Sequence, residues 1–553
     1  MSDNDSNESS PLLNKVSEDE TQIPKEIPRK HFKGESTTLR NPYVVNTQVI
    51  PHNASHEDLR NLAQYNRYRY YSKIHNVPGG EKLVIPDHAL PRILFWPYVA
   101  AQQNKQNSII TIFAIWNTMM GTSLLSLPWA LQQSGFALGI ILLFVMALIC
   151  FYTCYLIIQS TKSIEKKDSI EFVDICEIYL GPLGKYVSLI VGVAAFVGAV
   201  VVYWVLMSNF LYKVGKFAHV HGTGTSSGSS NDSNIMLTSV HQVLCKSLDQ
   251  HINKSHPHVI SPGTKNSFYT YWDQQKTVPF YLVALLLPLS CFKSPTFFTK
   301  FNSLGTFSVL YLLVFVVVKA SQWGPHLHFN VPKYEAPSVL FSMNFPALTG
   351  ILALALYIHN AIMSILATNA KPQNNVRDVG VAYILTASTY LFVAVVFYVC
   401  FPLDKDCIEQ VFLDNFLSTD IMTFIAHCGL LFQMTTVFPL LMYIVRVQVL
   451  GAIFNSTTYS YTKIIIHNIP FISLGVMMAV LYPNVGHIIR YVGSISGMIY
   501  IFTLPSLVFV AINFKTKAQR QKNRLKTGLY FILHSILILL GVSNLVAQFF
   551  VKE

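Results

Sequence analysis

Charged residues are scarce in this chain, and their scarcity excludes several classes of protein. Of its 553 residues only 12% are Asp, Glu, Lys or Arg, about half the share usual in a soluble domain, and 52% are hydrophobic. No Asp or Glu occurs inside the long apolar runs, which argues against a carboxylate proton relay or a carboxylate clamp for a cationic substrate. We find no phosphate loop, nucleophile motif or metal-ligand cluster, so we do not expect an enzyme. A channel would need charge rings or filter-like repeats, and these are lacking too.

Eleven apolar runs are the main feature that is present. A helix needs about 20 apolar residues to cross a bilayer, and most of the runs reach that length. They cover residues 109–131, 137–159, 186–212, 277–292, 301–318, 346–368, 380–402, 421–445, 464–482, 487–511 and 528–549. The fourth and fifth runs are short. We therefore predict an all-α polytopic membrane protein with eleven transmembrane helices.

Basic residues in the short loops indicate the orientation of the chain, because loops rich in Lys and Arg stay in the cytosol. If the N-terminus is cytosolic, most of these cations fall in inside loops, so we place the C-terminus on the other side. A long polar segment precedes the first run, so we expect no cleavable signal peptide. The net charge of +12 is then a topology signal and an attraction to anionic lipid, and nothing suggests nucleic acid.

Residues 1–108 are predicted to form a cytosolic regulatory tail, largely disordered by composition in its first forty residues. Within it Glu8, Leu12 and Leu13 match the acidic dileucine pattern that directs membrane cargo to endosomes and lysosomes. Chance is the alternative explanation for so short a match.

Aromatic residues gather later in the tail, where Tyr70 and Tyr71 follow a stretch in which Tyr alternates with Arg. Tyrosines are rigid contact residues that lose little entropy on binding, which favours a segment that orders on a partner. Two alternatives stay open: a stretch that lies on the membrane surface, and a plug of the cytosolic mouth.

The predicted outer loop 213–276 is the longest internal loop and is rich in Gly, Ser and His. It carries two N-glycosylation acceptor patterns, at Asn231 and Asn253. Cys245 and Cys407 are the two cysteines placed in outer loops, on an oxidising side, so we predict a disulfide between them.

The first apolar run holds a polar break in its middle. Gly121 lies among Asn, Thr and Ser, and Pro128 follows soon after. Backbone groups that a broken helix releases cannot face lipid, so they must face a cavity, where they can hold ions and small zwitterions. The alternative is that these small residues only let a neighbouring helix approach closely.

Other polar residues lie deep in later runs. If the repeat is five spans, the sixth run is the counterpart of the first, and it carries Tyr357, His359 and Asn360. We favour a structural role for His359. His427, His534 and Arg490 are further in-span ionisable groups and so functional candidates. Adjacent Thr435 and Thr436 in the eighth run offer oxygens for Na⁺, although such hydroxyls are more often bonded to their own helix.

Residues 116–123, the eleven runs and the paired threonines resemble the amino acid/auxin permease group, and within it the solute carrier family of sodium-coupled neutral amino acid transporters. The tail resembles a lysosomal, arginine-sensing branch of that family. The resemblance implies a LeuT-like fold in which residues 109–318 and 346–511 form inverted repeats of five spans each. Residues 528–549 would be an extra eleventh helix.

The same resemblance implies a function and its partners. It implies a lysosomal transporter that binds lumenal arginine and exports essential amino acids such as leucine. Its tail would signal to the Rag GTPase and Ragulator complex, which activates the growth-control (target of rapamycin) kinase. The alternative is an ordinary sodium-coupled neutral amino acid transporter without a signalling role. Membrane lipid, including cholesterol, is the other expected partner.

Site residues carry over from the resemblance position by position. It assigns the substrate's α-groups to Thr118, Met119, Met120, Gly121, Thr122 and Ser123. It assigns Na⁺, as a coupling or structural ion, to Asn117 with Thr435 or Thr436, and no other cofactor. In the tail, the residues that match the partner-binding segment are Tyr70, Tyr71, Ile85, Pro86 and His88.

Overall fold

The computed structural model describes the membrane-spanning part of the chain. The described residues are 106–162, 164, 170–222, 243–245, 267–292, 305–327, 339–367, 369–454, 460–515 and 524–551. The chain separates into units of residues 1–104 and 105–553, and everything below concerns the second. The predicted sorting, partner-binding and glycosylation residues lie outside the described residues: Glu8, Leu12, Leu13, Tyr70, Tyr71, Ile85, Pro86, His88, Asn231 and Asn253.

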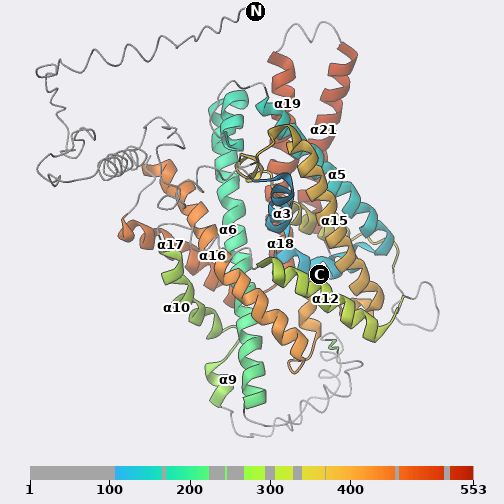
Figure 1. The fold of residues 1–553 in the computed structure, drawn as a ribbon, viewed down its shortest axis with the longest axis vertical. Helices are drawn as coiled ribbons and strands as arrows, with labels where there is room; N and C mark the ends of the chain where they lie inside the picture. The colour runs from blue at the N-terminus through green and yellow to red at the C-terminus, as the bar shows by residue number, and fades with distance from the viewer. Residues whose placement is uncertain are drawn as a thin grey trace, which may run out of the picture. The chain divides into compact units, whose positions relative to one another are not determined.

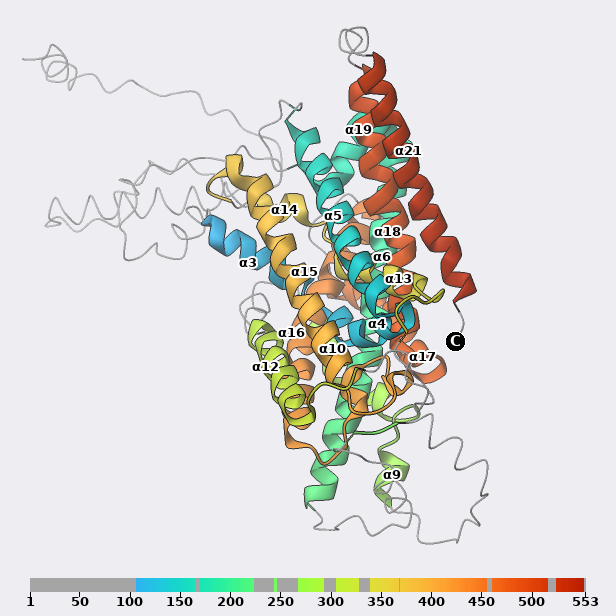
Figure 2. The same cartoon turned by 90° about the vertical axis from the view of Figure 1, so that its right-hand side faces the viewer.

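The regular secondary structure in the described residues is helical, apart from two isolated β-bridges. The longer elements are α3 (Ser108–Met119), η3 (Thr122–Ser126), α4 (Leu127–Ser134), α5 (Phe136–Thr161), α6 (Phe172–Gly222), α10 (Val278–Ser290), α12 (Gly305–Trp323), α13 (Pro346–Ala355), α15 (Asn375–Cys400), α16 (Ile421–Phe454), α17 (Tyr461–Leu481), α18 (Val485–Gly497), η7 (Met498–Thr503), α19 (Leu504–Lys515) and α21 (Arg524–Ala547). The shorter ones are α9 (Ser267–Tyr271), α14 (Ile362–Leu366), η4 (Pro372–Asn374), η5 (Lys405–Cys407), η6 (Phe412–Asn415) and η8 (Gln548–Phe550). Figures 1 and 2 show α19 and α21 packed side by side at one end.

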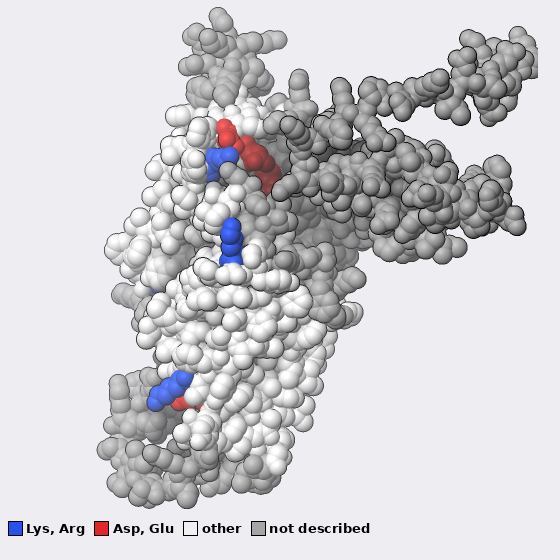
Figure 3. Space-filling model, turned by 90° about the vertical axis from the view of Figure 1, so that its left-hand side faces the viewer, with Lys and Arg blue, Asp and Glu red and all other residues white. Residues whose placement is uncertain are grey.

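Each predicted apolar run coincides with an apolar helix in the described residues, which makes the chain a multi-pass membrane protein. Eight described helices are long and apolar enough to cross a bilayer, and the bent pair formed by α3 with η3 and α4 makes a ninth. The runs at 277–292 and 346–368 correspond to shorter apolar helices, α10 and α13. One face of the molecule is almost free of charged side chains across its middle, as a lipid-facing surface requires (Figure 3).

The longest helix, α6, runs through the bundle beside α16 (Figure 1). It bends at Gly181, whose φ of 77° lies in the left-handed region that favours glycine, and Pro182 follows. Parts of the predicted loop 213–276 are helical, because α6 continues through Lys213 to Gly222 and α9 occupies Ser267–Tyr271. That this segment is lumenal stays a prediction. The apolar run extends into a polar helix here, and hydropathy alone does not report a helix beyond the membrane.

The short helix α10 ends with its carbonyl groups held by side chains from two other helices. Arg446 of α16 donates to the carbonyl oxygens of Ser290 (3.3 Å) and Phe292 (2.8 Å), and Asn468 of α17 donates to Ser290 (3.1 Å). A helix of 13 residues rises about 20 Å, less than the roughly 30 Å hydrocarbon core, so its end needs such partners. Arg446 is buried, with 2% of its surface exposed.

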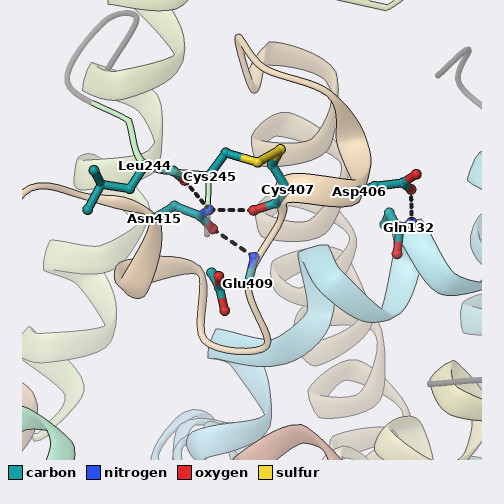
Figure 4. Close-up of a disulfide and its surroundings, with 7 residues drawn as sticks. All are labelled: Gln132, Leu244, Cys245, Asp406, Cys407, Glu409 and Asn415. Carbon is teal, nitrogen blue, oxygen red and sulfur yellow. Dashed lines mark hydrogen bonds between the residues drawn. A yellow bond between two sulfur atoms is a disulfide. The ribbon is translucent and has the colours of Figure 1, made fainter. Parts of the chain in front are cut away.

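The predicted disulfide between Cys245 and Cys407 is present, across a sequence separation of 162 residues (Figure 4). Asn415, fully buried, donates to the carbonyls of Leu244 (3.1 Å) and Cys407 (2.7 Å) and accepts from the Glu409 amide (2.9 Å). Together these contacts fasten the segment after α6 to the segment between α15 and α16.

Candidate functional site

The first membrane helix is interrupted, as the sequence predicts. α3 ends at Met119, and the chain resumes as the 3-10 helix η3 at Thr122, with a bend of 54° between the two parts. Gly121 between them has extended backbone (φ −112°, ψ −164°), which any residue adopts, and a Cβ there would make only an ordinary contact of 3.8 Å. The glycine is therefore not required by the backbone of this conformation. Its contribution is the space that a missing side chain leaves.

The sixth predicted span is interrupted too. α13 ends at Ala355 and α14 begins at Ile362, so the six residues between are not helical. His359 lies in this interruption, is fully buried, and has Nε2 2.8 Å from the Thr153 hydroxyl. The sequence signal for this break was weaker than for the first, because it rests on polar residues after Tyr357 rather than on a Gly set among hydroxyls.

Tyrosines of α15 hold the carbonyl groups that the two breaks release. The Tyr390 hydroxyl lies within hydrogen-bonding distance of the Met119 carbonyl, at the end of α3, and of the Ala355 carbonyl (3.0 Å), at the end of α13. The Tyr383 hydroxyl donates to the Leu356 carbonyl (3.2 Å). Sequence analysis missed both residues, which read as ordinary aromatics of an apolar run.

A cavity of about 280 Å³ lies between the two breaks. Its walls are residues 117–123, the stretch from Leu354 to Ala361, one face of α6 and one face of α16. Ordinary small-molecule sites span about 300–1,000 Å³, so the volume of this cavity lies just below that range. It brings together all six residues predicted to hold a substrate: Thr118, Met119, Met120, Gly121, Thr122 and Ser123. Asn117 lines it as well.

Three polar atoms in the cavity wall are buried and have no hydrogen-bond partner among the described residues. They are the Tyr357 hydroxyl, Nδ2 of Asn360 and Oε1 of Gln433. Buried polar groups are nearly always paired, so unpaired atoms from two elements around one cavity indicate a place where a polar ligand can bind. No lining side chain is charged, whether acidic or basic. Of these three residues sequence analysis noted the first two as polar and predicted none as a ligand.

The residues predicted to bind Na⁺ are placed differently from one another. Oδ1 of Asn117 accepts a hydrogen bond from the Thr306 hydroxyl (3.1 Å) of α12. The hydroxyls of Thr435 and Thr436 donate to carbonyls of their own helix, at Leu431 and Gln433 (both 2.7 Å). Neither threonine lines the cavity. In the described residues no cluster of His, Cys, Asp or Glu could hold a metal, so an ion here would rely on neutral oxygens.

The other ionisable candidates lie outside the cavity. His534 of α21 is 3.3 Å from the Tyr152 hydroxyl and 2.7 Å from the Tyr530 carbonyl. Arg490 of α18 is buried and donates to the Tyr491 hydroxyl (3.1 Å). His427 lines a second, separate pocket. Their roles stay predictions.

Fold and site together define a multi-pass membrane protein with a small neutral cavity between two interrupted helices. Comparison with known proteins makes the class specific. The family model described as "Transmembrane amino acid transporter protein" matches residues 104–254 and 233–547. Neutral amino acid transporter 9 of Xenopus laevis is 41% identical over 551 residues, 95% of this chain and 97% of that protein. The protein of the same name from Rattus norvegicus is 41% identical over 94% of each chain.

A more distant organism gives the same result. The sodium-coupled neutral amino acid transporter 9 homolog of Caenorhabditis elegans is 42% identical over 87% of this chain and 80% of that protein. The chain belongs to the transmembrane amino acid transporter family, and within it to the sodium-coupled neutral amino acid transporters. The family predicted from residues 116–123 and the tail is confirmed.

Proposed function

We propose that the chain transports amino acids and that the cavity between the two breaks is the substrate site. The three unpaired polar atoms of Tyr357, Asn360 and Gln433 carry this proposal, because a bound substrate would satisfy them. The backbone of residues 118–123 would hold the α-carboxylate and α-ammonium groups. The neutral, largely apolar wall favours an uncharged side chain such as that of leucine, and an arginine side chain would rest on hydroxyl, amide and aromatic groups.

Na⁺ is the coupling or structural ion that we propose. Asn117 offers an amide oxygen, and the hydroxyls of Thr435 and Thr436 keep oxygen lone pairs available, because each uses its hydrogen toward its own helix. We further propose eleven spans in a LeuT-like arrangement, with inverted repeats at 109–318 and 346–511. Breaks in the first and sixth spans support it, since such transporters place discontinuous helices in matching positions.

We also propose a signalling role and a lysosomal location, with the N-terminus cytosolic and the C-terminus lumenal. Lumenal arginine would be sensed, and the tail would engage the Rag GTPases and Ragulator. The support is the tail resemblance at Tyr70, Tyr71, Ile85, Pro86 and His88, and relatives that align over 95% of this chain and so into its tail. The disulfide supports an oxidising compartment on its side. Sorting by Glu8, Leu12 and Leu13 and glycosylation at Asn231 and Asn253 belong to the same proposal.

Filling the cavity tests the transport proposal. Thr122→Trp places an indole at the first break, and we expect it to abolish flux of labelled leucine and arginine in proteoliposomes. Val145→Trp on α5, where the side chain is 43% exposed, is the matched control and should retain flux. Undiminished flux in Thr122→Trp would rule out this site. Repeating the wild-type measurement across imposed Na⁺ and proton gradients identifies the coupling ion.

The signalling proposal needs its own measurement. Full-length chain in nanodiscs should bind Rag–Ragulator, and Tyr71→Ala or Pro86→Ala should stop binding while flux survives. A switch requires that arginine bind the two tail states with different affinity, so arginine should change the binding of Rag–Ragulator. If Rag–Ragulator binding changes with neither substitution nor with arginine, the chain would be an ordinary transporter without a signalling role.

A further inference from the structure

A second pocket, of about 240 Å³, lies further along α6 and α16, the two long helices that also line the first cavity. It is on the side that carries the disulfide. We call it the disulfide-side pocket. α6 contributes Asn209, Lys213 and Lys216, which fall on one face at spacings of four and three residues. α16 contributes Thr423 and His427 at a spacing of four. Asp414 and Asp420 complete the polar rim, and Leu244, next to Cys245, lines the pocket as well.

Most charges in this pocket already have partners. Asp414 is bound by Lys213, in an ion pair, and by Nδ2 of Asn209 (3.1 Å). Asp420 is bound by Lys319 (2.8 Å), which reaches it from α12. Lys216 is the lining cation that has no ion pair with any described residue, and its side chain is half-buried against the pocket. One positive charge is therefore available to a ligand.

His427 adds an available acceptor. Only 3% of it is exposed, and its ring packs 5.1 Å from the ring of Phe210. Its Nε2 has no partner in the described part of the chain. In the neutral tautomer that has its hydrogen on Nδ1, Nε2 presents a lone pair to the pocket. A buried ring nitrogen of this kind calls for a ligand that donates a hydrogen bond.

We infer that the disulfide-side pocket is a second binding site for a free amino acid. Lys216 would pair with the α-carboxylate, and Nε2 of His427 would accept from the α-ammonium group. A single small ion would satisfy one of these groups and leave the other, whereas a zwitterion satisfies both. The volume also suits this ligand, because it is close to the volume of the cavity between the two breaks, about 280 Å³. We call that first cavity the central cavity. This inference rests on the proposed transport function.

An apolar layer separates the two cavities, so they are distinct sites. Tyr203 lines the central cavity and Asn209 the disulfide-side pocket, and six residues along α6 correspond to about 9 Å. Gln433 and His427 have the same separation along α16. Leu206 and Met207 on α6 and Leu430 on α16 lie between these positions along the helices, and all three are buried. A substrate would occupy the disulfide-side pocket before or after the central one.

Saturation binding to the purified full-length chain in nanodiscs tests the inference, with labelled L-leucine and L-arginine as separate probes. We expect at least one probe to bind at two equivalents per chain. Thr122→Trp should lose the central equivalent and keep the other. Lys216→Met should lose the second equivalent and keep the central one, and Lys216→Arg should restore it. Lys276→Met, at an exposed cation next to α10, is the matched control and should bind as the wild type does.

The outcomes separate this inference from the transport proposal. One equivalent for both probes, abolished by Thr122→Trp and unchanged by Lys216→Met, overturns the second site and leaves the central site standing. If binding of the labelled amino acids is unchanged by Thr122→Trp but falls with Lys216→Met, the result supports the second site and rules out the central one. Lys216 lies at the pocket rim, so its variants should melt within a degree or two of the wild type, and a larger drop shifts the test to His427→Gln.

Discussion

At the scale of single residues, the cavity is marked by groups that the folded chain leaves unpaired. The hydroxyl of Tyr357 is buried without a partner among the described residues, whereas that of Tyr500, whose ring lies 5.6 Å away, donates to the Ser188 carbonyl. An unpaired buried hydroxyl lowers stability, so retaining one needs another reason. Substrate binding is the reason that we propose.

Tyr357→Phe should therefore separate stability from affinity. It removes an unpaired group, so the melting temperature should stay the same or rise slightly. Losing a hydrogen bond of about 0.5–1.5 kcal/mol should weaken substrate binding by roughly two- to twelvefold. Thermal melting and the KM of leucine uptake measure the two effects. Tyr500→Phe is the control, and it should instead lower stability with little effect on KM.

Asp420 gives a prediction about acid stability. Burial raises the pKa of its carboxyl, but hydrogen bonds from Lys319 and Thr423 outweigh burial and hold the pKa below its usual 3.8. A depressed folded pKa means that the ion pair contributes fully above the ordinary value and is lost as pH falls through the lower folded one. The pair should therefore remain intact at about pH 5, as in an acidic organelle.

We expect Asp420→Asn to lower the melting temperature equally at pH 7 and pH 5, since breaking a buried pair costs about 3–5 kcal/mol. The difference from wild type should shrink below about pH 4, where the wild-type carboxylate also protonates. Melting curves of the two proteins from pH 7 to pH 3 check this. A difference that already closes between pH 7 and pH 5 contradicts it.

At the scale of elements, the sequence predicted the first break because a Gly among Asn, Thr and Ser has no place in a plain anchor. The second break was harder, because the stretch around Tyr357 and His359 continues an apolar run. The tyrosines that hold the freed carbonyls, Tyr383 and Tyr390, could not be predicted, since their partners come from other helices. Runs and local breaks are read from one segment, but a cavity wall is made by several.

The cap on α10 is a second such case. Arg446 holds two carbonyls at the end of a helix that is too short to reach the membrane surface by itself. Arg446→Leu should remove charge-assisted hydrogen bonds worth about 1.5–3 kcal/mol each, so we expect a clear fall in melting temperature and in yield. Lys463→Leu, at an exposed cation of α17, is the control and should melt like the wild type. Equal melting of both variants would mean that the cap does not stabilise α10.

At the scale of the whole molecule, the disulfide joins segments that are far apart in sequence. Replacing Cys245 and Cys407 together by Ser should lower stability by about 2–4 kcal/mol, because the open loop gains freedom in the unfolded chain. Thermal melting of the double variant measures this, with Cys176→Ser on α6 as a cysteine control away from the disulfide. Non-reducing peptide mapping should show one linked pair of peptides in wild type, and its absence would contradict the disulfide.

The Tyr390 hydroxyl has one hydrogen but two carbonyl oxygens within reach, one at the end of each interrupted helix. It can therefore donate to only one of them at a time. Turning the O–H bond transfers the hydrogen bond from the end of α3 to the end of α13 without displacing any heavier atom. If either of these two helix ends moved away from α15, the other could still accept the hydrogen bond.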